Sequence, residues 1–400
     1  MYDRNRILQL LDQTRPGFSL PRALYRDEDV FEFDVEQIFT RSWLLIGFEV
    51  ELTEIGSYLA LTVGRNPILV VRGPDGTIRG FHNTCRHRGS QICADGRGRV
   101  SKLVCPYHMW SYDLEGRLVG AARMGGRSQL GETRLESIAV QVLAGCIYVA
   151  LGPNAPDFAP FKAAVGPVLE KYRLRETRLA HECVITEKAN WKLAMENARE
   201  CYHCASGHPE LRNTFPVGLS NGFEFGDGDH AKRYFEKIAS MGFPTKAAAT
   251  HWWQAGFYPL NPGIESISMD GKPVVNRRLI ESSESELGGF RWATDPNSFA
   301  HALVDYVFMF SVIPVGPQET HILCKWLVPK DAAEGVDYKL ENLIETWMKT
   351  NFQDRDLTEN NQRGVNSVAY RPGPYSADAE DYVTRFGQWY VSEARAAATA

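Results

Sequence analysis

The chain has 400 residues, which exceeds the usual size of one domain, about 100–200 residues, so we expect two domains. Hydrophobic residues make up 44% of the chain and charged residues 23%, and the formal net charge of −5 argues against a basic surface for nucleic acid. No apolar run approaches the roughly 20 residues of a membrane span, and the charged N-terminus lacks the apolar core of a secretion signal. The composition therefore predicts a cytoplasmic protein that acts on a small molecule.

The order of predicted elements along the chain suggests where the domains lie. Residues before Trp43 read as helical, whereas short β-rich runs separated by turn residues follow it and predict an antiparallel β domain. These runs cover residues 58–64, 66–76, 77–83 and 138–152. The proline-rich stretch 153–160 is the expected linker, and helical and mixed patterns follow it. We therefore expect one domain at 43–155 and a discontinuous second domain made of 1–42 and 156–400.

The eight cysteines are scattered along the chain and do not resemble the dense disulfide framework of a small secreted domain. Metal binding or simple burial is a better expectation for them than disulfides. Cys201 and Cys204 form an isolated C-x-x-C, which is a weak redox or zinc signal without a second pair, and we expect both to be buried thiols. Only Cys85 and Cys105 stand out.

Two cysteine–histidine pairs lie close together in the first half of the chain. Cys85 and His87 enclose one residue, and Cys105 and His108 enclose two. Thiolates and imidazoles suit either zinc or an iron–sulfur cluster. Structural zinc sites space paired ligands by two to four residues, so the C-x-H pair fits better a cluster in which two thiolates bind one iron and two imidazoles bind the other.

A second group of candidate metal ligands lies in the segment 190–209, which we predict to be one helix. Glu196, Glu200 and His203 stand at i, i+4 and i+7 and would share one face of that helix. His208 follows a glycine and precedes a proline, so the backbone can turn and bring both imidazoles onto one ion. Two histidines with one carboxylate leave open positions on an Fe(II) for oxygen and substrate.

The third ligand must come from elsewhere, and the predicted helix at 337–367 offers three acids. An apolar stripe that passes through Trp347 continues to Asp354, whereas Asp356 lies roughly 200° away around the axis. An acid on a buried face needs a partner, and a metal ion supplies one. We therefore expect Asp354 to be the ligand, and Asp356 and Glu359 to be solvated charges.

These motifs resemble those of a known family. C-x-H-R-G followed by C-P-x-H is similar to the Rieske fingerprint, and Glu196–His208 matches E-N-x-x-(D/E)-x-Y-H-x-x-x-x-H. The chain thus resembles the large (alpha) subunits of Rieske non-haem iron oxygenases. The resemblance implies an α+β protein: an all-β Rieske domain and a helix-grip (START-like) catalytic domain with an antiparallel sheet and long helices. It also implies a homotrimer.

The resemblance implies roles for the same residues. Cys85, His87, Cys105 and His108 would hold a [2Fe–2S] cluster, and His203, His208 and Asp354 would hold a mononuclear Fe(II). In the family, the acid at the position of Glu200 links a histidine of the mononuclear iron to the Rieske histidine of a neighbouring subunit. Glu200 would therefore be the bridge for electron transfer between subunits, and His108 of one chain would lie at the other end of that bridge.

The bridging position carries glutamate, which is typical of a subgroup that acts on quaternary ammonium compounds. The stretches 199–211, 325–338 and 362–376 extend this resemblance to glycine betaine monooxygenases and proline betaine (stachydrine) demethylases. The implied reaction uses O2 to hydroxylate an N-methyl group, which releases formaldehyde and the demethylated amine. The alternative within the family is an aromatic-ring-hydroxylating oxygenase. An electron carrier of the Rieske ferredoxin type would have no use for the second metal site.

Two further expectations concern partners and substrate. No G-x-G-x-x-G motif follows a strand, so electrons from NAD(P)H should arrive through a separate reductase that carries flavin and an iron–sulfur centre. A quaternary ammonium group favours aromatic faces, and the stretch 215–305 is rich in aromatic residues. Trp252, Trp253 and Tyr258 are the residues we select there as substrate contacts.

Overall fold

A computed structural model describes the chain from residue 2 to residue 400, apart from 125–130, 218–219, 222–223, 226–227 and 282–286. It divides into two compact units. One unit is Phe39–Pro156, and the other is Met1–Ile38 with Asp157–Ala400. The first unit is a β structure and the second combines a large antiparallel sheet with helices, so the predicted α+β class is confirmed.

The unit Phe39–Pro156 is built on a seven-stranded antiparallel sheet with the order β1-β10-β9-β4-β3-β2-β5. Its strands are β1 (Leu44–Phe48), β2 (Ser57–Val63), β3 (Asn66–Arg72), β4 (Ile78–His82), β5 (Gly96–Arg99), β9 (Ser137–Leu143) and β10 (Cys146–Ala150). Each β-rich run of the sequence forms a strand, and the longest run forms β9 and β10. A turn at Ala144 and Gly145, both with positive φ, separates those two strands.

A second, three-stranded sheet of the same unit carries the Cys105–His108 loop, whereas the Cys85–His87 loop follows β4 of the first sheet. The three-stranded sheet consists of β6 (Leu103–Val104), β7 (Ser111–Tyr112) and β8 (Leu118–Gly120). A buried cluster that includes Leu69, Phe81 and Leu103 packs beneath the two loops. The hydrophobic effect therefore stabilises the base on which the loops stand.

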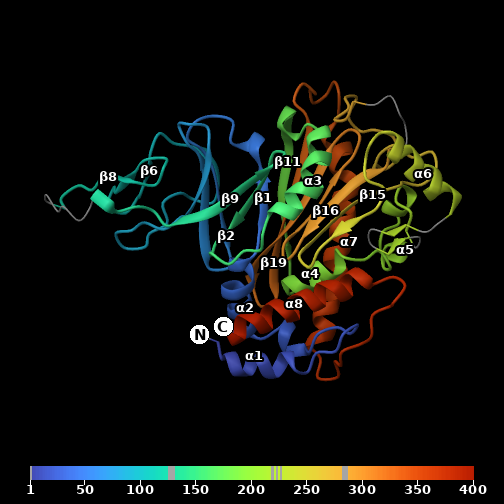
Figure 1. The fold of residues 1–400 in the computed structure, drawn as a ribbon, viewed down its shortest axis with the longest axis horizontal. Coiled ribbons are helices and arrows are strands. Elements are labelled where there is room, and N and C mark those ends of the chain that lie inside the picture. The colour runs from blue at the N-terminus through green and yellow to red at the C-terminus, as the bar shows by residue number, and fades with distance from the viewer. Residues whose placement is uncertain (1, 125–130, 218–219, 222–223, 226–227, 282–286) are drawn as a thin grey trace. The chain divides into compact units, whose positions relative to one another are not determined.

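The other unit contains a seven-stranded antiparallel sheet with the order β11-β19-β18-β17-β16-β15-β14 (Figure 1). The strands are β11 (Thr177–Glu187), β14 (Ala248–Ala249), β15 (Trp253–Tyr258), β16 (Gly289–Thr294), β17 (Ser298–Ala302), β18 (Val307–Gly316) and β19 (Glu319–Pro329), and β12 (Ser220–Asn221) pairs separately with β13 (Glu224–Phe225). Every residue of β15 and β16 is buried. Both faces of these strands are therefore covered by other parts of the unit.

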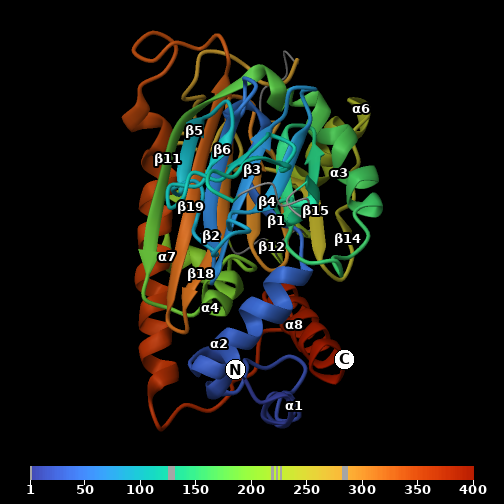
Figure 2. The ribbon, with the colours of Figure 1, turned by 90° about the vertical axis from the view of Figure 1, so that its left-hand side faces the viewer.

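Helices surround this sheet. They are α1 (Arg4–Leu11), α2 (Glu28–Phe33), α3 (Ala159–Lys171), α4 (Trp191–Asn197), α5 (Cys204–Gly207), α6 (Asp229–Ser240), α7 (Leu340–Asn366) and α8 (Asp381–Thr399). The long helix α7 runs beside β11 and β19 (Figure 2), as the predicted helix-grip arrangement requires. Its buried face begins with Leu343 and Trp347 but then carries Thr350, Asn351 and Thr358. Polar side chains on a buried face need polar partners. Asp354 lies in this polar part of the helix, between Asn351 and Thr358.

The N-terminal segment fixes α4 from the side away from the sheet. Asp34, which is fully buried, accepts hydrogen bonds from Trp191 Nε1 at 3.0 Å and from the Tyr390 hydroxyl at 2.9 Å. It also forms a buried ion pair with Lys192. These contacts join the N-terminal segment, α4 and α8, so the helix that precedes the second metal site cannot shift freely.

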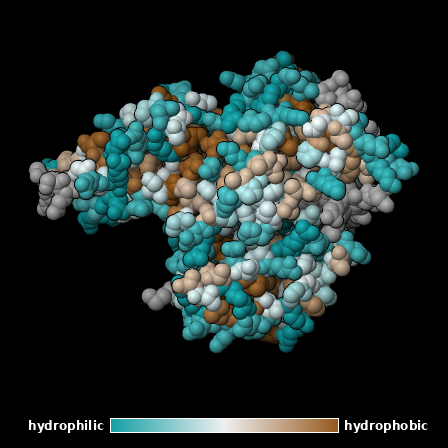
Figure 3. All heavy atoms as spheres, in the orientation of Figure 1, coloured by the Kyte–Doolittle hydropathy of each residue, from teal (hydrophilic) through white to brown (hydrophobic). Residues whose placement is uncertain are grey.

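The surface of this unit is mostly hydrophilic in the view of Figure 3. Helix α6 illustrates this, because it buries Tyr234 and Ile238 and presents charged residues outward. In the described part of the chain, no helix combines the length and apolar character needed to cross a membrane.

Candidate iron centres

The two loops of the first site repeat one turn. The backbone N–H of Gly89 donates to the Cys85 carbonyl at 2.9 Å, and the N–H of Met109 donates to the Cys105 carbonyl at 3.0 Å. Gly89 and Met109 both have positive φ, at 76° and 60°. A left-handed residue four positions after each cysteine turns the chain back on itself. Each loop thereby presents a cysteine and a histidine on one side.

The four candidate ligands of these loops lie together. Cys85 and Cys105 are buried free thiols, and the rings of His87 and His108 are 4.6 Å apart. Burial acts to raise the pKa of Cys105, but hydrogen bonds from the backbone N–H groups of Tyr107 and His108 and from the Cys85 and Ser90 side chains together outweigh it and lower the pKa. His87 Nδ1 is buried and has no hydrogen-bond partner among the described residues. Two buried thiols and two imidazoles, one with an unused nitrogen, fit a [2Fe–2S] cluster.

The second site does not lie on one continuous helix, so that part of the prediction is wrong. Helix α4 ends at Asn197, and α5 begins only at Cys204. In the break, Glu200 accepts hydrogen bonds from the backbone N–H groups of Tyr202 and His203. A side chain that binds nearby backbone N–H groups competes with the helical hydrogen bonds. Glu196 therefore does not share a face with His203; its carboxylate accepts from the Tyr25 hydroxyl at 2.7 Å.

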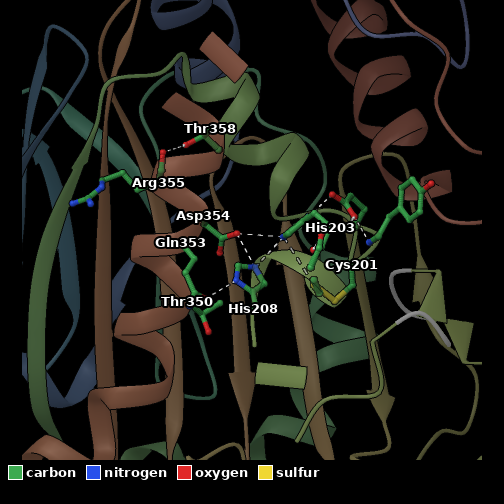
Figure 4. A network of polar contacts seen from close by, with 12 residues as sticks. Cys201, His203, His208, Thr350, Gln353, Asp354, Arg355 and Thr358 are labelled. Atoms are coloured by element: carbon green, nitrogen blue, oxygen red, sulfur yellow. Dashed lines mark hydrogen bonds and ion pairs between the residues drawn. A yellow bond between two sulfur atoms is a disulfide. The ribbon is translucent and has the colours of Figure 1, made fainter. Parts of the chain in front are cut away.

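The break brings the two histidines against α7 (Figure 4). His203 Nε2 lies 3.0 Å from His208 Nε2 and 3.3 Å from Asp354 Oδ1, and His208 Nε2 lies 3.0 Å from the same oxygen. Neighbouring ligands on one metal ion, each about 2.1 Å from it, lie about 3 Å apart. The three atoms therefore have the mutual spacing of a facial triad. The structure does not bring Asp356 or Glu359 to this point: Asp356 pairs with Arg355 and is 66% exposed.

Hydrogen bonds on the outer side of each imidazole fix its orientation. His203 Nδ1 bonds to Glu200 Oε1, and His208 Nδ1 lies 2.9 Å from Gln353 Oε1. An Nδ1–H that donates to an oxygen leaves the Nε2 lone pair for a metal. Gln353 is held in turn, because its Nε2 donates to Glu210 at 2.8 Å. Both histidines thus present the ligating nitrogen to the same point.

The electrostatics of this group favour a cation at its centre. Burial acts to lower the pKa of His203, but Asp354 and Glu200 outweigh it and raise the pKa to about 10. Burial acts to raise the pKa of Asp354, but the two imidazoles outweigh it and lower the pKa to about 2. Two carboxyl groups around two imidazoles attract positive charge, and a divalent metal supplies it. The residues present therefore fit a mononuclear iron.

Gln353 was not predicted from the sequence, and its role can be tested. Gln353→Ala removes the acceptor that orients His208, and loss of such a partner weakens metal binding by about 10–100-fold. We expect the variant to lose its mononuclear iron at chelator concentrations that the unmodified protein tolerates, with the cluster absorption unchanged. Iron content measured against chelator concentration checks this. Equal iron retention in both proteins would show that Gln353 does not support the site.

Cys201 and Cys204 form a disulfide, so the expectation of two buried thiols is wrong. The end of α4 brings their Cα atoms to 4.9 Å, which is within the range that a disulfide can bridge. His203 lies between them in sequence, and Cys204 Sγ is 3.9 Å from His203 Nε2. Because Cys204 is bonded to Cys201, it offers no thiolate to a metal in this state.

A cavity that is partly open to solvent adjoins His203, His208 and Asp354. The other walls include six large side chains from the sheet, α7 and the segment after α5: Phe215, Arg291, Phe299, His301, Phe310 and Trp347. The candidate metal ligands therefore form one part of the wall of a mainly aromatic pocket, and Arg291 places one buried cation in the same wall.

The predicted substrate contacts lie elsewhere. Trp252 and Trp253 are buried and pack against Phe161 of α3, at ring separations of 5.5 and 5.4 Å, and neither lines the cavity. Tyr258 lies behind the cavity wall, where its hydroxyl is 2.6 Å from His301 Nδ1. The aromatic residues that do line the cavity come from segments far apart in sequence, so only the folded structure brings them together.

Comparison with known proteins agrees with these centres. Residues 42–134 match the Rieske [2Fe-2S] domain, and residues 171–395 match the catalytic domain of the ring hydroxylating alpha subunit. The glycine betaine monooxygenase oxygenase subunit of Chromohalobacter salexigens is 40% identical over 97% of this chain and 88% of its own length. The chain belongs to the Rieske oxygenase alpha subunits. It is therefore an oxidoreductase that uses a [2Fe–2S] cluster and a mononuclear iron.

Other relatives of this Rieske oxygenase are also informative. The Pseudomonas aeruginosa PAO1 glycine betaine monooxygenase oxygenase subunit is 40% identical over 94% of this chain and 88% of its own length. Among solved structures, the quaternary ammonium Rieske monooxygenase CntA in complex with L-carnitine has a TM-score of 0.72 at 20% identity, over 96% of this chain and 98% of that one. Naphthalene 1,2-dioxygenase with indole gives 0.69 at 19% identity, over 97% and 96%. At such identities the structures show the shared fold.

Proposed function

We propose that this Rieske oxygenase hydroxylates an N-methyl group of a small betaine, with glycine betaine first and proline betaine second among the candidate substrates. The main support is the 40% identity with glycine betaine monooxygenase oxygenase subunits over almost the whole chain. The ring-hydroxylating alternative shares the fold and both iron centres but lacks this support from sequence.

The reaction needs little from the side chains beyond positioning. Iron held by His203, His208 and Asp354 would supply oxygen activation, and Cys85, His87, Cys105 and His108 would hold the cluster that delivers electrons. One O2, two electrons and two protons convert the N–CH3 group into N–CH2OH and water. The N–CH2OH product then breaks its C–N bond to give formaldehyde and the demethylated amine. The cavity must therefore hold one methyl group at a fixed place.

We propose that electrons pass between subunits through Glu200, within a homotrimer. The Cys105–His108 loop of the cluster unit exposes Tyr107 and Met109, which are 56% and 62% exposed, and the chain beside the second site exposes Tyr202 by 66%. Exposed aromatic and apolar side chains beside both centres suit contact between copies. A second hollow, lined by Leu193, Tyr375 and Glu380 among others, also reaches Glu200 and His203. The His108 imidazole of a neighbouring copy would bond to Glu200 there.

The electrons would come from NAD(P)H through a separate flavin and iron–sulfur reductase, and the pair would work in the cytoplasm. The relatives from Chromohalobacter salexigens and Pseudomonas aeruginosa are named oxygenase subunits of a monooxygenase, which supports the existence of a further component. No dinucleotide-binding G-x-G-x-x-G motif follows a strand in this chain.

A substrate panel tests the proposed function. Iron-replete protein with a surrogate reductase and NADH should release formaldehyde in step with oxygen uptake from glycine betaine or proline betaine. We expect kcat/KM for the better betaine to exceed that for carnitine, choline and benzoate by at least about tenfold, since each lacks part of the betaine's size or charge pattern. Formaldehyde quantification and an oxygen electrode supply the data. Oxygen uptake on benzoate, with no formaldehyde from any betaine, would favour ring hydroxylation instead.

A further inference from the structure

Two polar side chains stand next to each other on the sheet wall of the substrate cavity. Arg291 on β16 pairs across the strands with His301 on β17, and both line the cavity. They are 7% and 1% exposed. On the other side of Arg291, the paired residue of β15 is Gly256, which leaves room for the guanidinium group. The sheet therefore presents a buried cation and an imidazole side by side.

His301 is placed to donate a hydrogen bond into the cavity. Its Nδ1 lies 2.6 Å from the Tyr258 hydroxyl, and its Nε2 is buried without a hydrogen-bond partner among the described residues. Burial and the nearby Arg291 charge lower the pKa of His301 well below its usual value, so the ring is neutral. If the Tyr258 hydroxyl donates to Nδ1, the neutral ring carries its proton on Nε2. A buried N–H without a partner favours a ligand that accepts from it.

Aromatic rings surround these two donors in the same cavity. The Arg291 guanidinium carbon lies 5.8 Å from the centre of the Phe299 ring, and Phe299 packs edge-on against Phe310 at 6.2 Å. The Trp347 ring is 4.8 Å from the His301 ring. Aromatic faces attract a quaternary ammonium group, which has no N–H to donate. The cavity thus offers attraction for both ends of a zwitterion.

We propose that Arg291 and His301 bind the carboxylate of the substrate, while Phe299, Phe310 and Trp347 face its quaternary ammonium group. Arg291 is then the residue that selects zwitterionic betaines over cations without a carboxylate. This rests on the proposed function and adds the side chains that set its specificity. The candidate metal ligands come from α7 and the segment around α5, whereas Arg291 and His301 come from the sheet, and both groups line the same cavity.

The test compares Arg291→Gln with Arg291→Lys, using the holoenzyme and its reductase. Arg277→Gln is the matched control, because Arg277 is 48% exposed, pairs with Asp331 and Asp337, and does not line the cavity. Iron content and cluster absorption confirm that each variant is folded and loaded. Substrates are glycine betaine and choline, which share the trimethylammonium group but differ in the carboxylate. Binding is measured separately with 3,3-dimethylbutyrate, in which carbon replaces the nitrogen of glycine betaine.

For Arg291→Gln we expect kcat/KM for glycine betaine to fall about 100-fold, mainly through KM, because a buried charge partner is lost. Its kcat/KM for choline should change by less than about threefold, and 3,3-dimethylbutyrate should no longer compete. Arg291→Lys should recover part of the loss, and Arg277→Gln should match the unmodified protein. Equal losses on both substrates, or no loss on glycine betaine, would overturn the carboxylate assignment. No formaldehyde from any betaine with the unmodified protein would instead overturn the proposed function.

Discussion

Replacing His203 with alanine should empty the mononuclear iron site and leave the cluster in place. His203 supplies one of three ligand atoms that lie within 3.3 Å of each other. Removing a residue that only orients a ligand weakens metal binding about 10–100-fold, so removing a ligand itself should cost at least about 1,000-fold. Iron analysis should show loss of the mononuclear iron, the visible absorption of the cluster should persist, and formaldehyde release should fall below detection.

Asp356→Asn is the control for this variant. Asp356 lies two residues from Asp354 on α7, but its side chain is 66% exposed and pairs with Arg355. The control should retain iron and activity within about twofold, because surface charges away from a site contribute little. If the His203 variant lost the cluster absorption and kept the mononuclear iron, the division of ligands between the two centres would be wrong.

Glu200→Gln should keep both iron centres and yet slow the transfer of electrons between them. The glutamine oxygen can still accept from His203 Nδ1, so the imidazole keeps its orientation. The variant loses the carboxylate charge that would strengthen a hydrogen bond from His108 of a neighbouring subunit, and we expect reoxidation of the reduced cluster to slow by at least about 100-fold. Stopped-flow absorption of the cluster, after mixing reduced protein with glycine betaine and oxygen, measures this rate.

Glu359→Gln is the matched acid control for the bridge. Glu359 accepts a hydrogen bond from the Lys188 backbone N–H at 3.0 Å and pairs with Arg363, away from both histidines. Cluster reoxidation in this control should equal that of the unmodified protein. Normal reoxidation in Glu200→Gln would remove Glu200 from the electron path, even if its hydrogen bond to His203 remains.

The candidate metal ligands could be predicted from the sequence because metal binding constrains residue type and spacing. Cys85 and His87 lie in one short loop, and Cys105 and His108 lie in another. The proximity of each cysteine to the histidine of its own loop therefore depends on a local turn. Asp354 could be selected because an acid continued an apolar stripe, and that stripe depends only on the helical period. The long helix α7 and the strands of the cluster unit were predictable from the same periodicities.

The local structure around His203 could not be predicted from periodicity. The spacing of Glu196, Glu200 and His203 fits one helical face, but the Glu200 carboxylate binds backbone N–H groups and ends that helix. The disulfide of Cys201 and Cys204 depends on this break, because it sets their Cα separation. Such competition between side chain and backbone is decided by tertiary contacts.

The substrate cavity was also beyond the sequence alone. Its sheet wall combines Arg291, Phe299 and Phe310 from three strands, and only the strand register places them on one face. The aromatic residues selected from local composition, Trp252 and Trp253, belong instead to the core against α3. Residue type did not separate the two groups, since an aromatic side chain suits a core as well as a pocket.

A single-turnover experiment tests the central claim most directly. Protein reduced in advance, with no reductase present, holds one electron in the cluster and one in the mononuclear iron, which is enough for one hydroxylation. Mixed with glycine betaine and oxygen, it should yield about one formaldehyde and one dimethylglycine for each loaded active site, and the Glu200→Gln variant should yield far less. N-demethylation of a betaine would be contradicted if the cluster became fully oxidised and hydrogen peroxide appeared in place of formaldehyde. The same conclusion would follow if reduced protein mixed with benzoate and oxygen hydroxylated the benzoate, while glycine betaine gave no formaldehyde.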